Sequence, residues 1–159
     1  MPELPEVEVV RRGLDATVRG ARIETVQVLW PPFVEATPAK IRTAVIGHRI
    51  GAARRRGKLL ILDLDHDYHL LVHLMMTGQV VVHRRGRPVL AGGHPTPNIL
   101  GPMPNPWTRA VFALSGSRML FVNDSRKFGR IRVVNAAELA AELFLTRLGP
   151  EPLSNDFTV

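Results

Sequence analysis

The chain has 159 residues, 45% of them hydrophobic, which suits one domain with a substantial core. It carries 21 Lys and Arg against 14 Asp and Glu; the resulting charge of +7 and pI of about 11.2 favour a polyanionic partner such as nucleic acid, with a generally basic soluble protein as the alternative. The absence of cysteine excludes disulfides and any cysteine-ligated zinc within this chain.

No apolar run reaches the length of a membrane-spanning helix. The acidic N-terminus lacks the basic-then-apolar pattern of a secretion signal. The lack of cysteine also fits a reducing compartment. We therefore expect a soluble, cytoplasmic monomer with no membrane partner.

Helical patterns are predicted at three places in the chain. The first is an amphipathic helix over residues 5–18, in which Pro5 suits the first helical position and apolar residues recur at the helical period. A shorter helix is expected over residues 37–46, and a last one over residues 136–149.

Short apolar segments joined by turn residues dominate the chain between residues 21 and 134. Many short strands without intervening helices are typical of an antiparallel sandwich or barrel. The Gly- and Pro-rich segment 83–107 has no periodicity, so we expect one long, mobile loop there. The predicted fold is α+β and mainly β: an antiparallel β-sandwich flanked by an N-terminal and a C-terminal helix.

The domain organisation is predicted from the polar, Pro-containing tail that follows the last helical pattern. Residues 1–149 are expected to form one domain, and residues 150–159 the start of a linker to a domain that this chain does not contain.

The opening sequence "MPELPEVE" holds more Pro and Glu than a helix start needs. If Met1 is removed, the chain begins with the secondary amine of Pro2, whose pKa near 8 leaves a nucleophilic fraction at neutral pH. Such an amine attacks carbonyl-like carbons to give a cationic iminium. Glu3 is then a candidate proton donor or acceptor. A helix-starting Pro-Glu pair is the alternative.

A basic run precedes the strand "KLLILDL". Arg54, Arg55 and Arg56 stand before Gly57 and Lys58, and basic residues at a strand mouth suit contacts to phosphate. The alternative is an exposed basic turn between two strands.

The segment "NDSRKFGRIRV" places Arg126 and Lys127 beside Phe128. An aromatic side chain flanked by cations can act as a wedge in a DNA stack, although a plain turn with an inward phenyl ring is the alternative. The six histidines, among them His66, His69 and His73, form no convincing metal set in the sequence.

Several blocks of the chain together resemble the formamidopyrimidine-DNA glycosylase family of bacterial base-excision repair. The blocks stand in the family's order and span the whole chain: "MPELPEVE", "RRRGKLLILDL", "HLMMTGQ", "DSRKFG" and "LGPEPLSNDF". The opening Pro-Glu-Leu-Pro, in place of Pro-Glu-Gly-Pro, favours this branch over the related endonuclease VIII branch.

The resemblance implies a bifunctional glycosylase and abasic-site lyase that excises oxidised purines such as 8-oxoguanine and formamidopyrimidines from double-stranded DNA. It implies three catalytic residues: the amine of Pro2 attacks C1′, Glu3 is the general acid/base, and Lys58 contacts the phosphate beside the lesion and helps catalysis. Successive β- and δ-elimination would follow. The trio that fills the gap left by a flipped nucleotide would be Met76, Arg126 and Phe128. Arg109 is also expected to bind DNA.

The chain departs from the family pattern in a few places. Ser125 and Lys127 stand where the family often has Pro and Arg, Leu59 replaces a common Tyr, and the Gly/Pro-rich loop is longer. These changes leave the damage preference open. Whole family members continue into a helical domain and a four-cysteine zinc finger, so we expect no cofactor in this chain and zinc only in that absent finger.

Two classes of function are therefore carried forward. The first is an enzyme domain whose isolated activity is reduced, because half of the DNA cleft is missing. The second is a non-catalytic module of the same fold that binds damaged DNA, which would have no need of Pro2 and Glu3. For an enzyme, we expect Pro2, Glu3 and Lys58 to converge on one rim, and Met76 and Phe128 to be exposed.

Overall fold

The computed structural model describes residues 2–141 of the chain. Its helices are α1 (Leu4–Thr17), α2 (Pro38–Val45) and α3 (Ala136–Ala141), with a short 3-10 helix at Pro31–Phe33. Its strands are β1 (Ile23–Val28), β2 (Ile50–Arg56), β3 (Leu59–Leu64), β4 (Tyr68–His73), β5 (Gly78–Arg84), β6 (Arg87–Gly93), β7 (Thr108–Leu114), β8 (Arg118–Asp124) and β9 (Arg130–Asn135).

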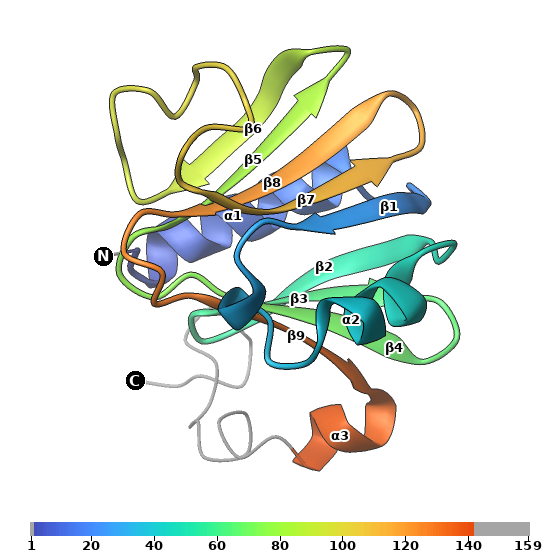
Figure 1. The fold of residues 1–159 in the computed structure, drawn as a ribbon. Coiled ribbons are helices and arrows are strands. Elements are labelled where there is room, and N and C mark those ends of the chain that lie inside the picture. Colours follow the sequence, from blue (N-terminus) through green and yellow to red (C-terminus); the bar gives the residue numbers. More distant parts are fainter. Residues whose placement is uncertain (1, 142–159) are drawn as a thin grey trace.

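The strands form two antiparallel sheets that face each other (Figure 1). The five-stranded sheet has the order β1-β7-β8-β5-β6, and the four-stranded sheet has the order β2-β3-β4-β9. The predicted antiparallel β-sandwich with a helix at each end is confirmed. The last predicted helix is confirmed at its start by α3; the rest of it, and the expected linker 150–159, lie outside the described residues.

The main core lies between the sheets and includes one face of α1. Val7, Val10 and Leu14 repeat at the helical period, are almost fully buried, and join apolar residues of both sheets. The helix touches both sheets, since Gly13 lies against Leu90 of β6 and Arg11 donates to the carbonyl of Ala53 in β2. The helix is thereby held between the two sheets.

The expectation of one aperiodic loop over residues 83–107 is wrong for its first half, because β6 pairs with β5 there. Pro88 and the pair Gly92–Gly93 hid this strand from the sequence pattern. Proline is tolerated because β6 is an edge strand. Gly92 lies so close to α1 that a Cβ would stand 2.6 Å from Val10 Cγ2.

The second half of that segment is anchored to the outer face of the five-stranded sheet. Ile99 and Met103 pack against a buried cluster of that face (Val81, Val111 and Phe121). The side chain of Gln79 donates to the carbonyl of His94 at 2.7 Å and to Thr96 Oγ1 at 2.9 Å. The segment is therefore a packed cover for the sheet and not a loosely attached loop.

Candidate active site

The start of α1 fixes the position of Pro2 and Glu3. Glu3 is the N-cap residue, and its backbone N–H donates to the carboxylate of Glu6 in the first turn. Its carbonyl accepts from the N–H of Val7 at 3.0 Å. Pro2 is buried, so the residue that precedes the cap is held against the body of the domain.

Lys58 reaches the same place from the turn between β2 and β3. Gly57 has a φ of +58°, a backbone conformation that favours glycine, and so allows the tight turn. The ammonium of Lys58 lies 2.8 Å from Glu3 Oε2. The hydrogen bond and the charge of Lys58 lower the pKa of Glu3 below its ordinary value. Glu3 is therefore a carboxylate at neutral pH.

Pro2 and Lys58 line one small pocket of about 190 Å³. Its walls are mostly apolar, and the pocket lies where the start of α1 meets the ends of β2 and β4. The predicted convergence of Pro2, Glu3 and Lys58 on one rim is thus confirmed as geometry. The lining residues are Pro2, Val7, Lys58, His73, Leu74, Met75 and Met76.

Arg55 lies behind this site and is paired inside the domain. Its side chain is only 4% exposed, and it donates to Glu8 of α1 at 3.1 Å and to the carbonyl of Gly57 at 3.2 Å. The hydrogen bonds from Arg11, and then from Arg55, lower the pKa of Glu8 to about 2 although burial opposes this. Arg55 thus links α1 to the turn that carries Lys58.

The other two arginines of the basic run lie on the same strand. Arg54 makes a two-pronged ion pair with Asp63 of β3, at 2.8 and 2.7 Å. Arg56 is the last residue of β2, directly before the Gly57–Lys58 turn, and is partly exposed. Of the three, Arg54 and Arg56 have the exposure that a phosphate contact requires.

Met76 and Phe128 are exposed, as predicted for side chains that would enter DNA. Their relative exposures are 40% and 46%, in a domain whose other large apolar side chains are mostly buried. Arg126 lies between them: its guanidinium is 3.7 Å from the sulfur of Met76 and 4.8 Å from the centre of the Phe128 ring. Because Met76 also lines the pocket, this trio continues directly from Pro2 and Lys58.

A buried carboxylate, Asp124, organises both loops that carry the trio. It accepts hydrogen bonds from the hydroxyl of Thr77 and from the N–H groups of Arg126, at 3.2 Å, and Gly129, at 2.5 Å. Gly129 is required, since a Cβ there would stand 2.7 Å from the carbonyl of His73. Asp124 was not among the residues predicted from the sequence, although Asp124 and Gly129 are of residue types that favour turns.

Two further predicted DNA-binding residues have partners within the chain. Arg109 is 9% exposed and donates to the carbonyl of Asp124 at 2.8 Å, which makes it part of the support for these loops. Lys127 has a φ of +61°, and its ammonium lies 3.9 Å from the centre of the Trp30 ring. Lys127 stays at the surface beside Phe128.

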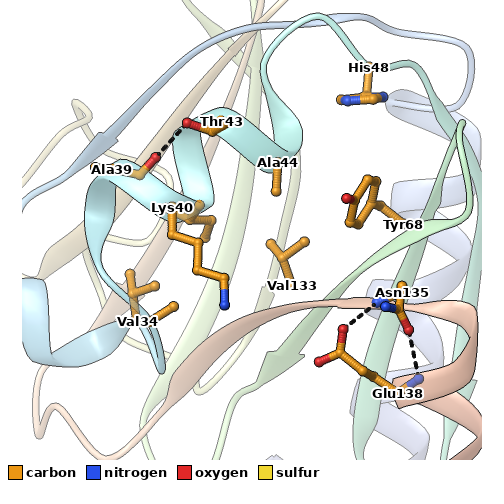
Figure 2. A pocket seen from close by; sticks show the side chains of 12 residues that line it. Val34, Ala39, Lys40, Thr43, Ala44, His48, Tyr68, Val133, Asn135 and Glu138 are labelled. Atoms are coloured by element: carbon orange, nitrogen blue, oxygen red, sulfur yellow. Dashed lines mark hydrogen bonds between the residues drawn. The ribbon is translucent and has the colours of Figure 1, made fainter.

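A second and larger pocket, of about 650 Å³, lies away from this site between α2, β4, β9 and α3. Figure 2 shows Lys40 and Ala44 of α2 on one side of it, and Val133 and Glu138 on the other. It contains none of the residues predicted to act in catalysis or DNA binding. Among the described residues, no helix is long and apolar enough to cross a membrane.

Fold and site together define a class of protein: a β-sandwich in which Pro2 and Glu3, at the start of α1, lie beside Lys58. A model of the "Formamidopyrimidine-DNA glycosylase N-terminal domain" family matches residues 1–131. The formamidopyrimidine-DNA glycosylases of Roseobacter denitrificans and Bacillus subtilis are each 36% identical to the chain, across 99% of it and 53% and 52% of their own lengths. The chain belongs to this family.

Solved structures agree with this assignment. The Lactococcus lactis enzyme, crystallised with DNA that contains N7-benzyl-Fapy-dG, superposes with a TM-score of 0.79 at 26% identity, over 95% of this chain and 50% of that one. The same protein has also been crystallised with DNA that contains an abasic site, with a TM-score of 0.78. The chain spans about half the length of the relatives it matches.

Proposed function

We propose that the chain is the catalytic half of a bifunctional DNA glycosylase and abasic-site lyase that acts on oxidised purines in double-stranded DNA. One observation carries the proposal: Pro2 and Lys58 share a pocket, and Glu3 pairs with Lys58 at its rim. These three groups meet through the start of one helix and one tight turn. A module that only binds DNA has no use for such an arrangement.

The proposed reaction begins at the nitrogen of Pro2, after removal of Met1. Its lone pair attacks C1′ of the flipped nucleotide, the bond from C1′ to the base breaks, and the base leaves with a proton. The proton on the departing base comes from water. The C1′–O4′ bond of the sugar then breaks as O4′ takes up the proton that the amine has lost, and the nitrogen lone pair forms an iminium that links C1′ to the protein. This cation draws electrons from C2′, so loss of a C2′ proton expels the 3′ phosphate, and a further elimination expels the 5′ phosphate.

Glu3 and Lys58 have separate roles in this scheme. The ionised carboxylate of Glu3 can accept the proton that leaves the attacking amine and return it in a later step. The ammonium of Lys58 can bind the phosphate beside the lesion. Met76, Arg126 and Phe128 would fill the gap in the duplex, which offsets part of the few kcal/mol that extrusion of a nucleotide costs.

Activity of this chain alone is expected to be reduced. The relatives are about twice as long, so the surface of the other half is not available to hold the DNA or to help to flip the base. Cleavage of the strand at an abasic site requires neither extrusion of a base nor cleavage of a glycosidic bond. We therefore expect lyase chemistry to survive better than excision of an intact damaged base.

Borohydride trapping tests the proposal, because it reduces an iminium to a stable adduct. The chain that begins at Pro2 should give an adduct with abasic DNA, and the same chain with Met1 retained should give none, since Pro2 is then an amide. Lys40→Ala, at an exposed lysine of α2, is a control for Lys58→Ala. Intact mass assigns the N-terminus of each sample.

Two outcomes would point elsewhere. DNA binding without any adduct from the chain that begins at Pro2 would favour the non-catalytic binding module. An adduct from the form with Met1, lost in Lys58→Ala but kept in Lys40→Ala, would make the lysine the nucleophile.

A further inference from the structure

Two histidines and an aspartate gather at the end of the four-stranded sheet. His48 lies two residues before β2, while Asp65 and His66 belong to the turn between β3 and β4. Each offers one nitrogen or oxygen atom, and these three atoms lie within 4.8 Å of one another. Asp65 and His66 are exposed and His48 is half-buried, so the group is open to solvent on one side.

The strand register brings these residues together. Ile50 of β2 is opposite Leu64 of β3, so the residues just outside the two strand ends meet. The N–H of Asp65 donates to the carbonyl of Arg49 at 3.1 Å, which holds the turn against the segment of His48. His66 has a φ of +56°, which directs the turn back over that segment.

The donor types and their contacts suit a transition-metal cation. Nδ1 of His48 lies 2.5 Å from Oδ1 of Asp65, so the two side chains make a hydrogen bond in the free protein. The rings of His48 and His66 meet edge to face, with centroids 5.2 Å apart. The nearby guanidinium of Arg49 donates to the carbonyl of Gly20 at 3.0 Å, so it is directed away from this carboxylate.

Two imidazoles and one carboxylate form a common protein set for Zn²⁺. In a tetrahedral zinc site, neighbouring ligand atoms stand about 3.3 Å apart, given metal–ligand bonds of about 2.0–2.1 Å. If a cation took the place of the hydrogen-bond proton, His48 Nδ1 and Asp65 Oδ1 would have to move apart by about 0.8 Å. Exposed side chains in a turn can make that adjustment.

We propose that His48, Asp65 and His66 form a binding site for Zn²⁺. The three side chains supply three ligands, so a tetrahedral ion keeps one position for water or a small anion. A bound metal ion would link the segment before β2 to the turn between β3 and β4. His48 also borders the larger pocket, as Figure 2 shows, so an anion on the ion would lie near the mouth of that pocket.

This set is not visible in the sequence, because His48 lies 17 residues before Asp65. The proposal is independent of the proposed glycosylase activity, since none of its three residues belongs to the pocket of Pro2 and Lys58. It also concerns a different zinc from that of a four-cysteine finger, because the chain has no cysteine.

Calorimetric titration of the 159-residue chain with ZnCl₂ alone tests the site. One zinc per chain is expected, with a rise in Tm of about 8 °C at a hundredfold excess over Kd. His66→Gly removes one ligand at a position whose positive φ glycine accepts freely, so the fold should survive while affinity falls at least about tenfold. Asp65→Asn should weaken binding similarly.

His69→Ala is the matched control. His69 is a neighbouring histidine that pairs with Asp63 at 2.8 Å and lies outside the proposed set. This variant should bind zinc like the parent chain. The proposal is overturned if the parent shows no saturable binding, or if His66→Gly and Asp65→Asn keep the parent's affinity. Circular dichroism of each variant establishes that it is folded before the titrations are compared.

Discussion

Glu3 and Lys58 form an ion pair in the free protein. Their 2.8 Å contact lowers the pKa of Glu3 and occupies the ammonium that is proposed to bind phosphate. When DNA arrives, a phosphate would compete with Glu3 for Lys58. Release of the carboxylate would raise its pKa toward the ordinary value, so its affinity for a proton would increase when the substrate is in place.

Lys58→Met should therefore raise the pKa of Glu3 toward 4.5, the value of an unperturbed glutamate. Lys58 favours the ionised carboxylate, so its loss makes protonation easier and moves the titration to higher pH. Carbon-detected NMR of the Glu3 carboxyl measures the midpoint directly. Lys40→Met should leave it unchanged. A Glu3 midpoint that is equal in all three proteins would contradict the assigned pair.

Both side chains are partly exposed, at 40% for Lys58 and 59% for Glu3. Salt should therefore reduce the difference between the parent and Lys58→Met. This exposure means that the pair matters for protonation and for DNA contact more than for the stability of the fold.

At the scale of elements, the contact between α1 and β2 fixes the spacing of the site. Glu8 of α1 accepts from Arg55 of β2, and Arg55 also donates to the carbonyl of Gly57 next to Lys58. The helix that starts at the Pro2–Glu3 end and the turn that ends at Lys58 are thus joined through two buried side chains. Exposure of Arg55 is only 4%, so solvent weakens this link little.

Glu8→Gln should lower the free energy of unfolding by about 2–3 kcal/mol near neutral pH, since it removes the charge from a network of arginine hydrogen bonds. Urea titration measures the change. Arg12 contacts Glu8 from the exposed side, so Arg12→Gln is a mild control. A loss of less than about 0.5 kcal/mol in Glu8→Gln would show that the network contributes little.

The pH dependence of this difference follows from the pKa of Glu8, which falls from 4.5 to about 2 on folding. A lowered pKa stabilises the fold fully above the unfolded value, and the contribution disappears as pH falls toward the folded value. The gap in stability between the parent and Glu8→Gln should therefore close between about pH 4.5 and pH 2. A gap that stays constant across this window would contradict the assignment.

The elements could be predicted where local pattern and tertiary setting agree. α1 shows its buried face as a repeat of apolar residues and carries a proline at its start, and most strands read as short apolar runs. β6 could not be found in this way. Its second residue is Pro88, and it ends with Gly92–Gly93. These residues are suitable only because this strand is an edge strand and lies against α1.

Some residues of the candidate site could also be predicted from the sequence, and others could not. Pro2, Glu3 and Lys58 could be proposed because their residue types have chemistry beyond folding. Asp124 and Glu8 look like ordinary acids in the sequence; their importance comes from being buried, which only the fold decides. The sequence likewise does not reveal which arginines are buried: Arg55 carries the same charge as its neighbours, but its side chain faces inward.

For the whole molecule, the charge of +7 predicts DNA binding that is weak and steeply dependent on salt. Each phosphate contact releases counterions, so two to three contacts reduce affinity by about tenfold or more between about 50 and 200 mM salt. Fluorescence anisotropy with a short duplex measures this slope. Lys58→Met should reduce the slope by about one unit, and Lys40→Met should not. Tight binding that is insensitive to salt would contradict this account.

The burial of Pro2 and the packing of α1 have a consequence for the order of events during synthesis. α1 is made first, but its partners include β2 and β6, so its docked position exists only after residues 87–93 have been made. Until then the N-terminus is free to meet an aminopeptidase. We expect trimming of Met1 to be far faster on the nascent or urea-unfolded chain than on the folded one, which mass spectrometry after timed digestion would measure. On this account, the amine that is proposed as the nucleophile would be exposed by an enzyme that acts before the domain has folded, and the completed fold would then enclose it.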